Sequence, residues 1–378
     1  MLKLGEVASY INGYAFKPED RGSEGLPIIR IQDLTGNSYD LGYYSGNYPK
    51  KIEINDGDIL ISWSASLGVY TWNKGKALLN QHIFKVEFIE DSIDKKYFVY
   101  AVRKKIDEMI RKSHGATMKH IIKKDFEDTI IPYPTLEEQY KIADELDRIS
   151  KIIDMRNQEL RLHDDLIRAR FVEMFGDPVK NTKGWEVKRL GELSIQINSG
   201  NTPKGGSSVY VDEGIAFFRS QNVWKDHLEM EDIVYISNDT HASMKRSSLK
   251  NGDILMTKTG RINTENSSLG RAALYVGEDD KANVNGHVYF IRLKPEVNNK
   301  FILRILVSVE YRDLIRRVCV GGIDKRQLNK EHIENFPIIC PPDSLIDKYI
   351  ELVDHIDKSK LLAASQLQIH IYKTLTLL

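Results

Sequence analysis

The sequence predicts an α+β protein in which two globular domains are separated by a pair of long antiparallel helices. Two helical patterns, each following a larger globular stretch, and an internal duplication support this prediction. The expected order is a globular domain at 1–134, a central helix at 135–176, a second globular domain at 177–341 and a C-terminal helix at 342–378. Antiparallel pairing of the helices as a coiled coil would relate the two copies by a pseudo-two-fold axis.

Short matching segments recur in the same order in both halves of the chain. The matched pairs are 3–7 with 189–193, 28–34 with 217–223, 55–60 with 250–255, 80–84 with 285–289, Gly115 with Gly322, and Pro134 with Pro341. The separation between partners grows from 186 residues (Lys3 to Arg189) to 207 residues (Gly115 to Gly322) without reversing. We therefore expect two copies of one structural unit, with longer loops in the second copy.

The central helix has a clear beginning and a clear end in the sequence. Thr135 and Glu138 have the spacing of a capping box, in which each side chain satisfies a backbone N–H group at the helix start. Gly176 can adopt the left-handed conformation that ends many helices, and Pro178 cannot continue a helix. Forty residues at about 1.5 Å each predict a rod roughly 60 Å long.

Apolar side chains recur at intervals of three and four residues along both helices, which predicts a paired seam. The residues expected to pair the helices are Leu146, Ile149, Ile153, Leu160, Ile167, Val353, Ile356 and Leu367. Three polar residues, Arg156, His163 and Arg170, interrupt the seam of the central helix. Ser344 and Asp347 predict a second capping box at the start of the C-terminal helix.

Within the first globular stretch, short apolar runs predict strands at 27–31, 59–62 and 83–88. A turn is predicted at 55–58, where Asn, Asp and Gly cluster. Residues 95–112 have apolar side chains at helical spacing and predict an amphipathic helix.

The composition favours a soluble cytoplasmic protein. The 378 residues include 54 Lys or Arg and 54 Asp or Glu, so the formal net charge is zero. Two cysteines, Cys319 and Cys340, argue against a disulfide framework. We expect no membrane association, because no charged n-region with an apolar h-region opens the chain and no apolar run approaches about 18 residues.

Basic residues concentrate at one place in each copy despite the zero net charge. Residues 94–124 contain ten Lys or Arg against three Asp or Glu, and residues 300–330 contain eight against three. One interpretation is a solvated helix face, and the other is a surface that contacts DNA phosphates. The candidate contact residues are Lys104, Lys105, Arg111, Lys112, Arg316 and Arg317, with His114, Lys119, Lys325 and Arg326 in the small-residue loops that follow.

Two further groups of residues have side chains suited to reading DNA bases. Polar loops after the matched strands contain Ser62, Trp63 and Ser64 in the first copy and Lys258, Thr259 and Arg261 in the second. Arg30 with Gln32, and Arg219 with Gln221, carry the side chains that recognise guanine and adenine through paired hydrogen bonds. Alternating Arg and Gln on a strand is also an ordinary solvent-facing pattern, so both interpretations stay open.

Motifs for catalysis and for cofactor or metal binding are absent from the sequence. It contains no Gly-rich phosphate loop, no nucleophile elbow, and no Asp-Pro-Pro-Tyr or Asn-Pro-Pro-Phe tetrapeptide of the adenine methyltransferases. His82 and His287 occupy equivalent positions, but each lies beside apolar residues without metal-ligand spacing, which favours a structural histidine. We expect a recognition protein that holds no cofactor and is not an enzyme.

Three segments resemble the specificity subunits of type I restriction–modification systems. The most specific is FGDPVKNTKGWEVKRLGE at 175–192, which in many members joins the central helix to the second variable domain. IIPYPTLEEQ at 130–139 is similar to the family's entry to that helix, and NSGNTP at 198–203 is similar to the start of a target-recognition domain. The resemblance covers the whole chain, although PPDSLI at 341–346 departs from the Leu-Glu-Glu-Gln pattern of the first helix entry.

The resemblance implies that each globular domain is a target-recognition domain for one half of a split DNA sequence, with the helices as a spacer. It also implies methyltransferase subunits that bind the helices and hold S-adenosylmethionine, and endonuclease–translocase subunits that complete the restriction complex. The residues alone leave two alternatives open. One is a self-contained DNA modification enzyme with a divergent active site, and the other is a coiled-coil scaffold with no role on DNA.

Overall fold

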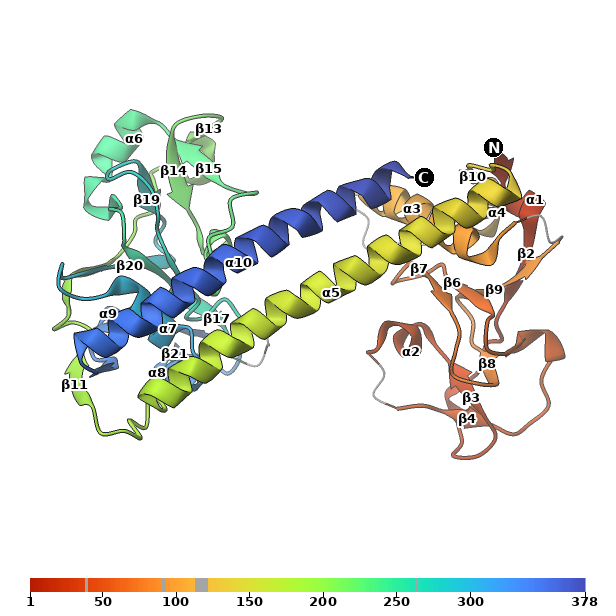
Figure 1. The fold of residues 1–378 in the computed structure, drawn as a ribbon, viewed down its shortest axis with the longest axis horizontal. Helices are drawn as coiled ribbons and strands as arrows, with labels where there is room; N and C mark the ends of the chain where they lie inside the picture. Colours follow the sequence, from red (N-terminus) through yellow and green to blue (C-terminus); the bar gives the residue numbers. More distant parts are fainter. Residues whose placement is uncertain (38–39, 90–92, 113–121, 263, 265, 378) are drawn as a thin grey trace. The chain divides into compact units, whose positions relative to one another are not determined.

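The computed structural model has two compact units, each with one globular copy and a part of each long helix (Figure 1). Unit 1 comprises Met1–Glu159 and Leu362–Leu378, and unit 2 comprises Leu160–Leu361. The structure describes residues 1–37, 40–89, 93–112, 122–262, 264 and 266–377. Since the unit boundaries fall within the long helices, the predicted division of the chain into four segments stays a prediction.

Two four-stranded sheets form the globular part of unit 1. The first contains β2 (Ala8–Asn12), β9 (Ile83–Phe88), β6 (Ile59–Ser62) and β7 (Gly68–Thr71) in that order, all antiparallel. The second contains β4 (Tyr43–Tyr44), β3 (Leu26–Ile29), β8 (Ala77–Leu79) and β5 (Glu53–Ile54), with β3 and β8 parallel. The remaining elements are β1 (Leu2–Lys3), β10 (Ile130–Ile131), α1 (Leu4–Val7), α2 (Ile31–Thr35), α3 (Lys95–Lys112), α4 (Lys123–Glu127), η1 (Pro18–Asp20) and η2 (Lys50–Ile52).

Unit 2 repeats this plan with additional elements. One sheet contains β12 (Ser194–Ser199), β20 (Val288–Leu293), β16 (Ile254–Thr257) and β18 (Ala272–Leu274). The other contains β13 (Tyr210–Val211), β15 (Val234–Ile236), β14 (Ile215–Phe218) and β19 (Ala282–Val284). A third sheet joins β17 (Thr259–Arg261), β22 (Lys325–Gln327) and β21 (Val320–Gly321), and β11 (Glu186–Arg189) pairs with β23 (Pro337–Cys340). The helices of the globular part are α6 (Asn238–Ser243), α7 (Asn299–Leu306), α8 (Val309–Val318), α9 (Lys330–Glu334), η3 (Gly206–Val209), η4 (Ser220–Asn222) and η5 (Lys245–Ser247).

The hydrogen-bond register confirms the internal duplication. Ile61 lies opposite Phe84 in unit 1, and the equivalent Met256 lies opposite Tyr289 in unit 2. The parallel pairs agree as well, because β3 with β8 and β14 with β19 align the matched residues in the same way. Strands β6 and β16 are buried at every position, and their shared register shows that both copies are built on the same strand pairing.

The two copies differ at one point in the pairing of the strands that they share, which we call the frame. In unit 2 the pairing of β12 with β20 shifts between Ser194 and Gln196, where one extra residue forms a bulge. After the bulge, the strand pairing of the two copies is equivalent again. The backbone N–H of Gly13 donates to the Ile83 carbonyl, and the N–H of the matched Gly200 donates to the Val288 carbonyl. Both glycines leave no room for a side chain, since an added Cβ would lie 2.0 Å from the Asn80 oxygen and 1.9 Å from the Val284 oxygen, respectively.

The central helix α5 runs from Leu136 to Phe175 and has the predicted ends. The backbone N–H of Thr135 donates to the Glu138 carboxylate (2.9 Å), and the N–H of Glu138 donates to the Thr135 hydroxyl (3.4 Å), which completes the capping box. Gly176 has a φ of 77° and ends the helix as expected. The indole of Trp185 then donates to the Phe175 carbonyl (2.9 Å) and satisfies one of the free carbonyls at the helix end.

The second predicted capping box is wrong. Helix α10 runs from Asp343 to Thr376, so Ser344 already lies inside the helix. The carbonyl of Pro342 accepts the first helical hydrogen bonds, from the N–H groups of Leu345 and Ile346. The spacing of Ser344 and Asp347 is therefore a coincidence within the first turn.

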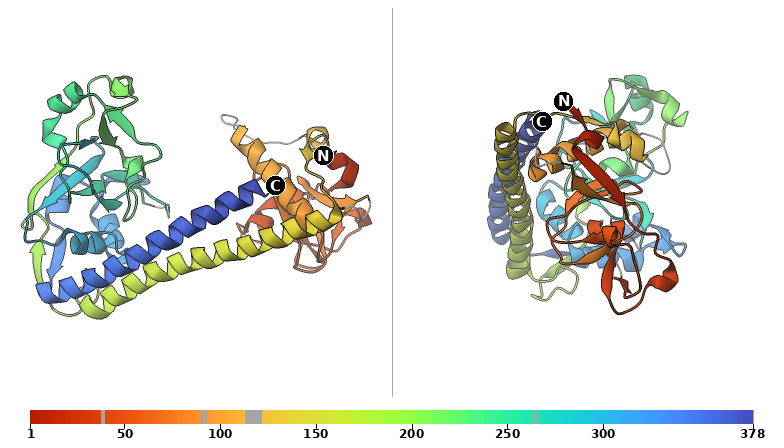
Figure 2. Two further views of the ribbon diagram at one scale, coloured as in Figure 1. Left: turned by 45° about the horizontal axis from the view of Figure 1, so that its top comes forward. Right: turned by 90° about the vertical axis from the view of Figure 1, so that its right-hand side faces the viewer.

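Within unit 2, α5 and α10 pack side by side and run in opposite directions (Figures 1 and 2). Lys360 of α10 pairs with Asp164 of α5 at 2.6 Å, whereas Tyr349, nearer the start of α10, contacts Phe175 at the end of α5, with ring centroids 5.4 Å apart. The residue numbers of the contacting partners thus fall along α5 as they rise along α10, which is the predicted antiparallel pairing.

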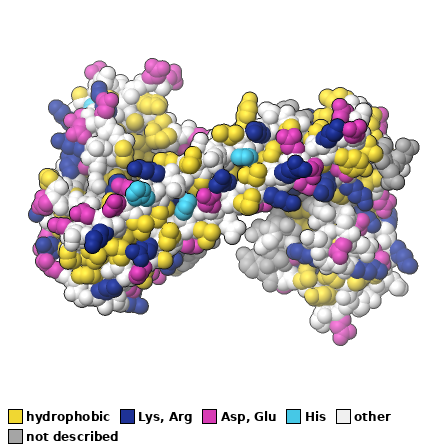
Figure 3. Space-filling model, in the orientation of Figure 1, with side chains coloured by type: hydrophobic (Ala, Val, Ile, Leu, Met, Phe, Trp, Pro, Cys, Tyr) yellow, Lys and Arg dark blue, Asp and Glu magenta, His cyan; other side chains and the backbone are white. Residues whose placement is uncertain are grey.

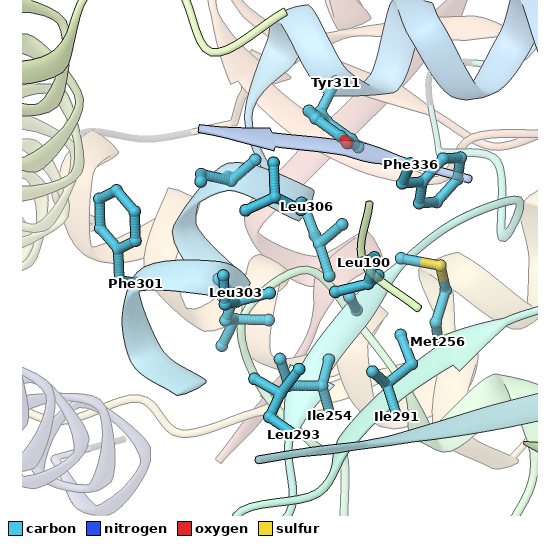
Figure 4. Close-up of a cluster of buried hydrophobic side chains, with 14 of the residues drawn as sticks. Leu190, Ile254, Met256, Ile291, Leu293, Phe301, Leu303, Leu306, Tyr311 and Phe336 are labelled. Atoms are coloured by element: carbon cyan, nitrogen blue, oxygen red, sulfur yellow. The ribbon is translucent and has the colours of Figure 1, made fainter. Parts of the chain in front are cut away.

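A continuous apolar core joins this helix pair to the sheet and to helices α7 and α8. Figure 4 shows a part of this core, which includes Met256 of the sheet, Phe301 of α7 and Tyr311 of α8. Of the predicted pairing residues, Ile167, Val353 and Ile356 lie in this core. In unit 1, Leu146 and Ile149 are buried. The others, Ile153, Leu160 and Leu367, are half-buried.

Candidate nucleic-acid interface

The Arg-Xaa-Gln pattern of the first copy does not lie on a strand, which corrects the sequence interpretation. Strand β3 ends at Ile29, and Arg30 is the N-terminal cap of the short helix α2. The Arg30 side chain is 9% exposed and pairs with Asp33 at 3.1 Å and Asp40 at 3.3 Å. Arg30 is therefore a buried, ion-paired residue rather than an open base-reading side chain, and the amide of Gln32 faces its guanidinium.

The second copy repeats this turn. Arg219 has nearly the same cap conformation as Arg30, and its backbone N–H donates to Asn222 at 3.0 Å as that of Arg30 donates to Asp33 at 2.7 Å. The Arg219 guanidinium pairs with Asp232 at 3.2 Å, and the Gln221 amide donates to the same carboxylate. The shared motif is thus explained by a capped turn after a strand. Among Arg30, Gln32, Arg219 and Gln221, only Gln221 is exposed.

The loops after the matched strands are closed by equivalent buried hydroxyl groups. Ser62 and Thr257 have no exposed surface, and both donate to carbonyl groups of the loop that follows. The next residues, Trp63 and Lys258, donate their backbone N–H groups to the carbonyls of His82 and His287. The Ser62 hydroxyl therefore holds the loop together, and Ser64 is also buried, while their predicted contact with DNA stays a prediction.

The matched histidines His82 and His287 make the same backbone bond in both copies, which a residue of any type could make. Each His contributes its carbonyl to hold the start of the loop, whatever its ring does. His82 has a φ of 73° and a buried Nδ1 atom without a hydrogen-bond partner, whereas the side chain of His287 is exposed. Across the part of the chain that the structure describes, no group of three or more His, Cys, Asp or Glu is arranged to hold a metal ion.

In unit 2 the structure brings together two groups of candidate residues that the sequence treats separately. Strand β17 carries Thr259 and Arg261, and β22 carries Lys325 and Arg326, with Gly260 opposite Arg326 and Arg261 opposite Lys325. Strand β21 completes this three-stranded sheet (Figure 1). In the chain, β21 comes directly after the basic end of α8. No sequence signal indicated this pairing, because strands of two or three residues have no measurable periodicity.

Further interactions hold the β17 loop to the rest of the copy. The backbone N–H of Leu328 donates to the Lys258 carbonyl at 2.9 Å. The Lys258 ammonium lies 5.8 Å from the centre of the Tyr289 ring. Arg271, at the end of the loop, stacks on Trp224 at 3.8 Å and donates to the Ser267 carbonyl at 3.0 Å, and burial lowers the pKa of its guanidinium. Arg271, which no sequence pattern indicated, thus positions the loop.

The other basic candidates lie on the helices that precede these loops. In α3, Lys104 and Lys105 are half-buried, and Lys105 pairs with Glu108 at 3.1 Å. In α8, Arg316 pairs with Asp313 at 3.4 Å and Arg317 is exposed. The side chains of Arg111 and Lys112, and residues His114 and Lys119 in the small-residue loop, lie outside the described part of the structure.

The surface of the long helices carries a second feature that the sequence analysis missed. Large apolar side chains are exposed between charged ones on these helices (Figure 3). They are Leu136, Tyr140, Met155, Leu162, Leu166 and Val172 on α5, and Leu361, Leu362, Ile369, Ile371 and Tyr372 on α10. Nowhere in the described ranges is a helix both long and apolar enough to cross a membrane.

Comparisons with known proteins agree with this architecture. A family model described as "Type I restriction modification DNA specificity domain" matches residues 1–162 and 182–368. The EcoBI specificity subunit of Escherichia coli is 27% identical over 94% of this chain and 78% of its own length. The MjaVIII specificity subunit of Methanocaldococcus jannaschii is 24% identical over 85% of this chain and 77% of its own length.

Solved structures share the fold at lower identity. The type I restriction–modification S subunit from M. genitalium superposes with a TM-score of 0.56 and 14% identity, covering 99% of this chain and 93% of that one. A chain from a study of the assembly and conformational transition of the type I system superposes with a TM-score of 0.53 and 17% identity, covering 100% of this chain and 93% of that one. The chain therefore belongs to the DNA specificity subunits of type I restriction–modification systems, which recognise the DNA target for the complex and are not its catalysts.

Proposed function

We propose that each copy of the duplicated unit reads one half of a split DNA target, and that the paired helices keep the two halves at a fixed separation. The observation that carries this proposal is the shared frame with different loops. Both copies hold the start of the loop by the same N–H bond to a histidine carbonyl, but Trp63 and Lys258 stand at that matched position. A common frame with different contact side chains would place two different readers on one duplex.

The proposed contacts to DNA divide into two classes. The exposed or half-buried basic side chains Lys104, Lys105, Arg317, Lys325 and Arg326 would neutralise phosphates, which gives affinity without sequence information. Gln221, Lys258, Thr259 and Arg261 would reach base edges. Gln221 is exposed in η4, Lys258 is half-buried just before β17, and Thr259 and Arg261 lie on β17.

We also propose how the chain works with its partners. Methyltransferase subunits would bind along α5 and α10, where the exposed apolar side chains offer a surface that a partner can cover. Those subunits would hold S-adenosylmethionine, and this chain would hold no cofactor. Endonuclease–translocase subunits would join the same complex, and because its substrate is cellular DNA we propose a cytoplasmic location.

The test is to map methylated adenines across the genome of a host with and without the gene, in the presence of the partner methyltransferase gene. The proposal expects a motif with two short specific halves and an unread gap of constant length, present only when this chain is expressed. A continuous motif without a gap, or a methylation pattern that does not depend on this chain, would contradict it. Methylation by the purified chain alone would instead support a self-contained enzyme.

A further inference from the structure

The loop between β21 and β22 presents an isoleucine directly to solvent. The side chain of Ile323 is 90% exposed, which is the highest value among the large apolar side chains that the structure describes. Its neighbours in the loop are Gly321, Gly322 and Asp324, so no larger apolar side chain shields it. Leaving such a side chain in water forgoes the stabilisation that burial would give, which suggests that another molecule covers it.

The loop that carries Ile323 is fixed from both sides. The Asp324 carboxylate forms an ion pair with the Arg261 guanidinium at 3.2 Å, and the Asp324 carbonyl accepts a hydrogen bond from the Ile262 N–H at 3.1 Å. On the other side, Nε of Arg326 donates to the Gly322 carbonyl at 3.2 Å. Ile323 is therefore held in place by bonds on both of its neighbours.

The backbone at the base of the loop requires glycine. Gly321 has a φ of 135°, and a Cβ at this position would lie 2.8 Å from the Lys325 carbonyl oxygen. The two short strands can approach each other closely only because no side chain stands there. The result is a narrow, two-stranded ribbon with Ile323 at its tip.

The charge around the tip suits a polyanion. Lys325 and Arg326 lie on β22 of the ribbon, and Arg261 lies on the neighbouring strand β17. The one carboxylate beside Ile323, that of Asp324, is already paired with Arg261. The side chains of Arg261 and Lys325 are exposed. A basic ribbon of two strands has the width that the major groove of B-form DNA admits.

From these observations we propose that Ile323 contacts the C5 methyl group of a thymine in the major groove, and so specifies a T·A pair in the half-sequence read by the second copy. This inference rests on the proposed function. An isoleucine has no hydrogen-bonding group, so among the base edges of the major groove only the thymine methyl offers it an apolar partner. Lys325 and Arg326 on the same ribbon would bind the flanking phosphates and set its depth.

The experiment uses the assembled methyltransferase containing this chain and a duplex carrying the mapped target sequence. Each thymine of the second half-sequence is replaced in turn by deoxyuridine, which removes only the methyl group. We expect one replacement to weaken binding about fourfold, the effect of one buried methyl group. Ile323→Ala should weaken binding to the unmodified duplex by at least as much and should abolish the effect of that one replacement.

The control is Val276→Ala, because Val276 is a similarly exposed apolar side chain of the same unit outside the β17–β22–β21 sheet. It should leave both the affinity and the deoxyuridine effect unchanged. The inference is overturned if the second half-sequence contains no thymine, if Ile323→Ala retains the wild-type response at every thymine, or if it weakens assembly with the methyltransferase instead. Failure of the proposed function is a different result, namely binding that does not distinguish the mapped sequence from other DNA.

Discussion

The two copies have the same strand register but differ in the loops attached to it. In unit 1 the chain passes from Ser62 to β7 through residues 63–67, and the loop closes on itself. In unit 2 the equivalent passage from Thr257 to β18 contains β17, which pairs with β22. Burial on both sheet faces fixes the register, whereas a surface loop can lengthen without disturbing it. The difference between the copies therefore separates the shared strands from the loops that vary between them.

A second difference lies where each copy packs against a long helix. Lys96 pairs with Asp147 of α5 at 2.6 Å, and the equivalent Lys300 pairs with Asp354 of α10. One turn further on, Tyr100 bonds Ser150 and Asp147 in the first copy. In the second copy Arg304 takes the place of Tyr100 and pairs with Asp357 at 3.2 Å and with Asp226. Both copies therefore have the Lys–Asp ion pair. Beside it, the first copy has the hydroxyl bonds of Tyr100, and the second has the ion pairs of Arg304.

The strongest test of the shared frame is to fill the two matched close approaches. Gly13→Ala and Gly200→Ala would each place a Cβ about 2 Å from a backbone oxygen, so we expect each to destabilise its own copy by roughly 3 kcal/mol. Denaturant unfolding of the two variants measures this. Gly286→Ala is the matched control, because its Cβ would meet nothing closer than 3.4 Å. Unequal effects at Gly13 and Gly200 would show that the frames are not equivalent.

A second test addresses the helices that join the copies. Four residues inserted after Leu160 in α5 and four after Leu361 in α10 add about 6 Å of helix at the two unit boundaries. We expect the unread gap in the methylated motif to lengthen by one or two base pairs, with both half-sequences unchanged. An active variant with the original gap would show that the helices do not set the separation.

The third test compares phosphate contacts of the two copies. Lys325→Gln and Lys104→Gln should each reduce the slope of log affinity against log salt concentration by about 0.9, since each removes one phosphate contact. Discrimination between sequences should stay the same, because phosphate contacts do not read bases. Lys281→Gln, an exposed position in the β18–β19 turn, serves as the control. A changed half-sequence with an unchanged salt slope would assign the residue to base reading.

The smallest expected effect concerns the helix contact of the first copy. Burial acts to raise the pKa of Asp147, but hydrogen bonds from Lys96 and Tyr100 outweigh it and hold the pKa below its ordinary value of 3.8. A lowered pKa in the folded state stabilises the protein above pH 3.8, and this contribution is lost as the pH falls through the folded-state pKa.

Asp147→Asn should therefore cost less than about 1 kcal/mol at neutral pH, because the pair is partly exposed. The difference in the free energy of unfolding between this variant and the parent protein should shrink below about pH 4. Asp144→Asn, which removes an exposed pair with Arg148, is the control and should have a smaller effect. A difference that stays constant from pH 7 to pH 3 would contradict this account.

The frame could be predicted from the sequence because its signals are local or repeated. The strands at 59–62 and 83–88 and the helix at 95–112 have the predicted ends, and the capping box at Thr135 and the stop at Gly176 form as expected. The strand at 27–31 is shorter than predicted, because Arg30 caps a helix there. A capping Arg-Xaa-Gln-Asp turn has no signature that separates it from a solvent-facing strand.

The candidate site could be predicted only in part. The basic composition and the variable loops located Lys325, Arg326 and Arg261, but nothing in the sequence indicated that β17 and β22 would pair. That pairing depends on contacts between residues far apart in the chain, and on the positive φ of Gly321. The sequence did not indicate that Ser62 and Arg30 are buried, because a polar side chain in a loop is equally consistent with closing the loop and with binding.

The central claim, that each copy reads one half-sequence, is tested most directly by exchanging one copy. Residues 194–336 would be replaced by the corresponding region of the E. coli EcoBI specificity subunit, and the methylated motif of the host would be mapped. The account predicts that one half-sequence changes, while the other half and the length of the gap stay the same. A motif in which both halves change, or neither does, would contradict it.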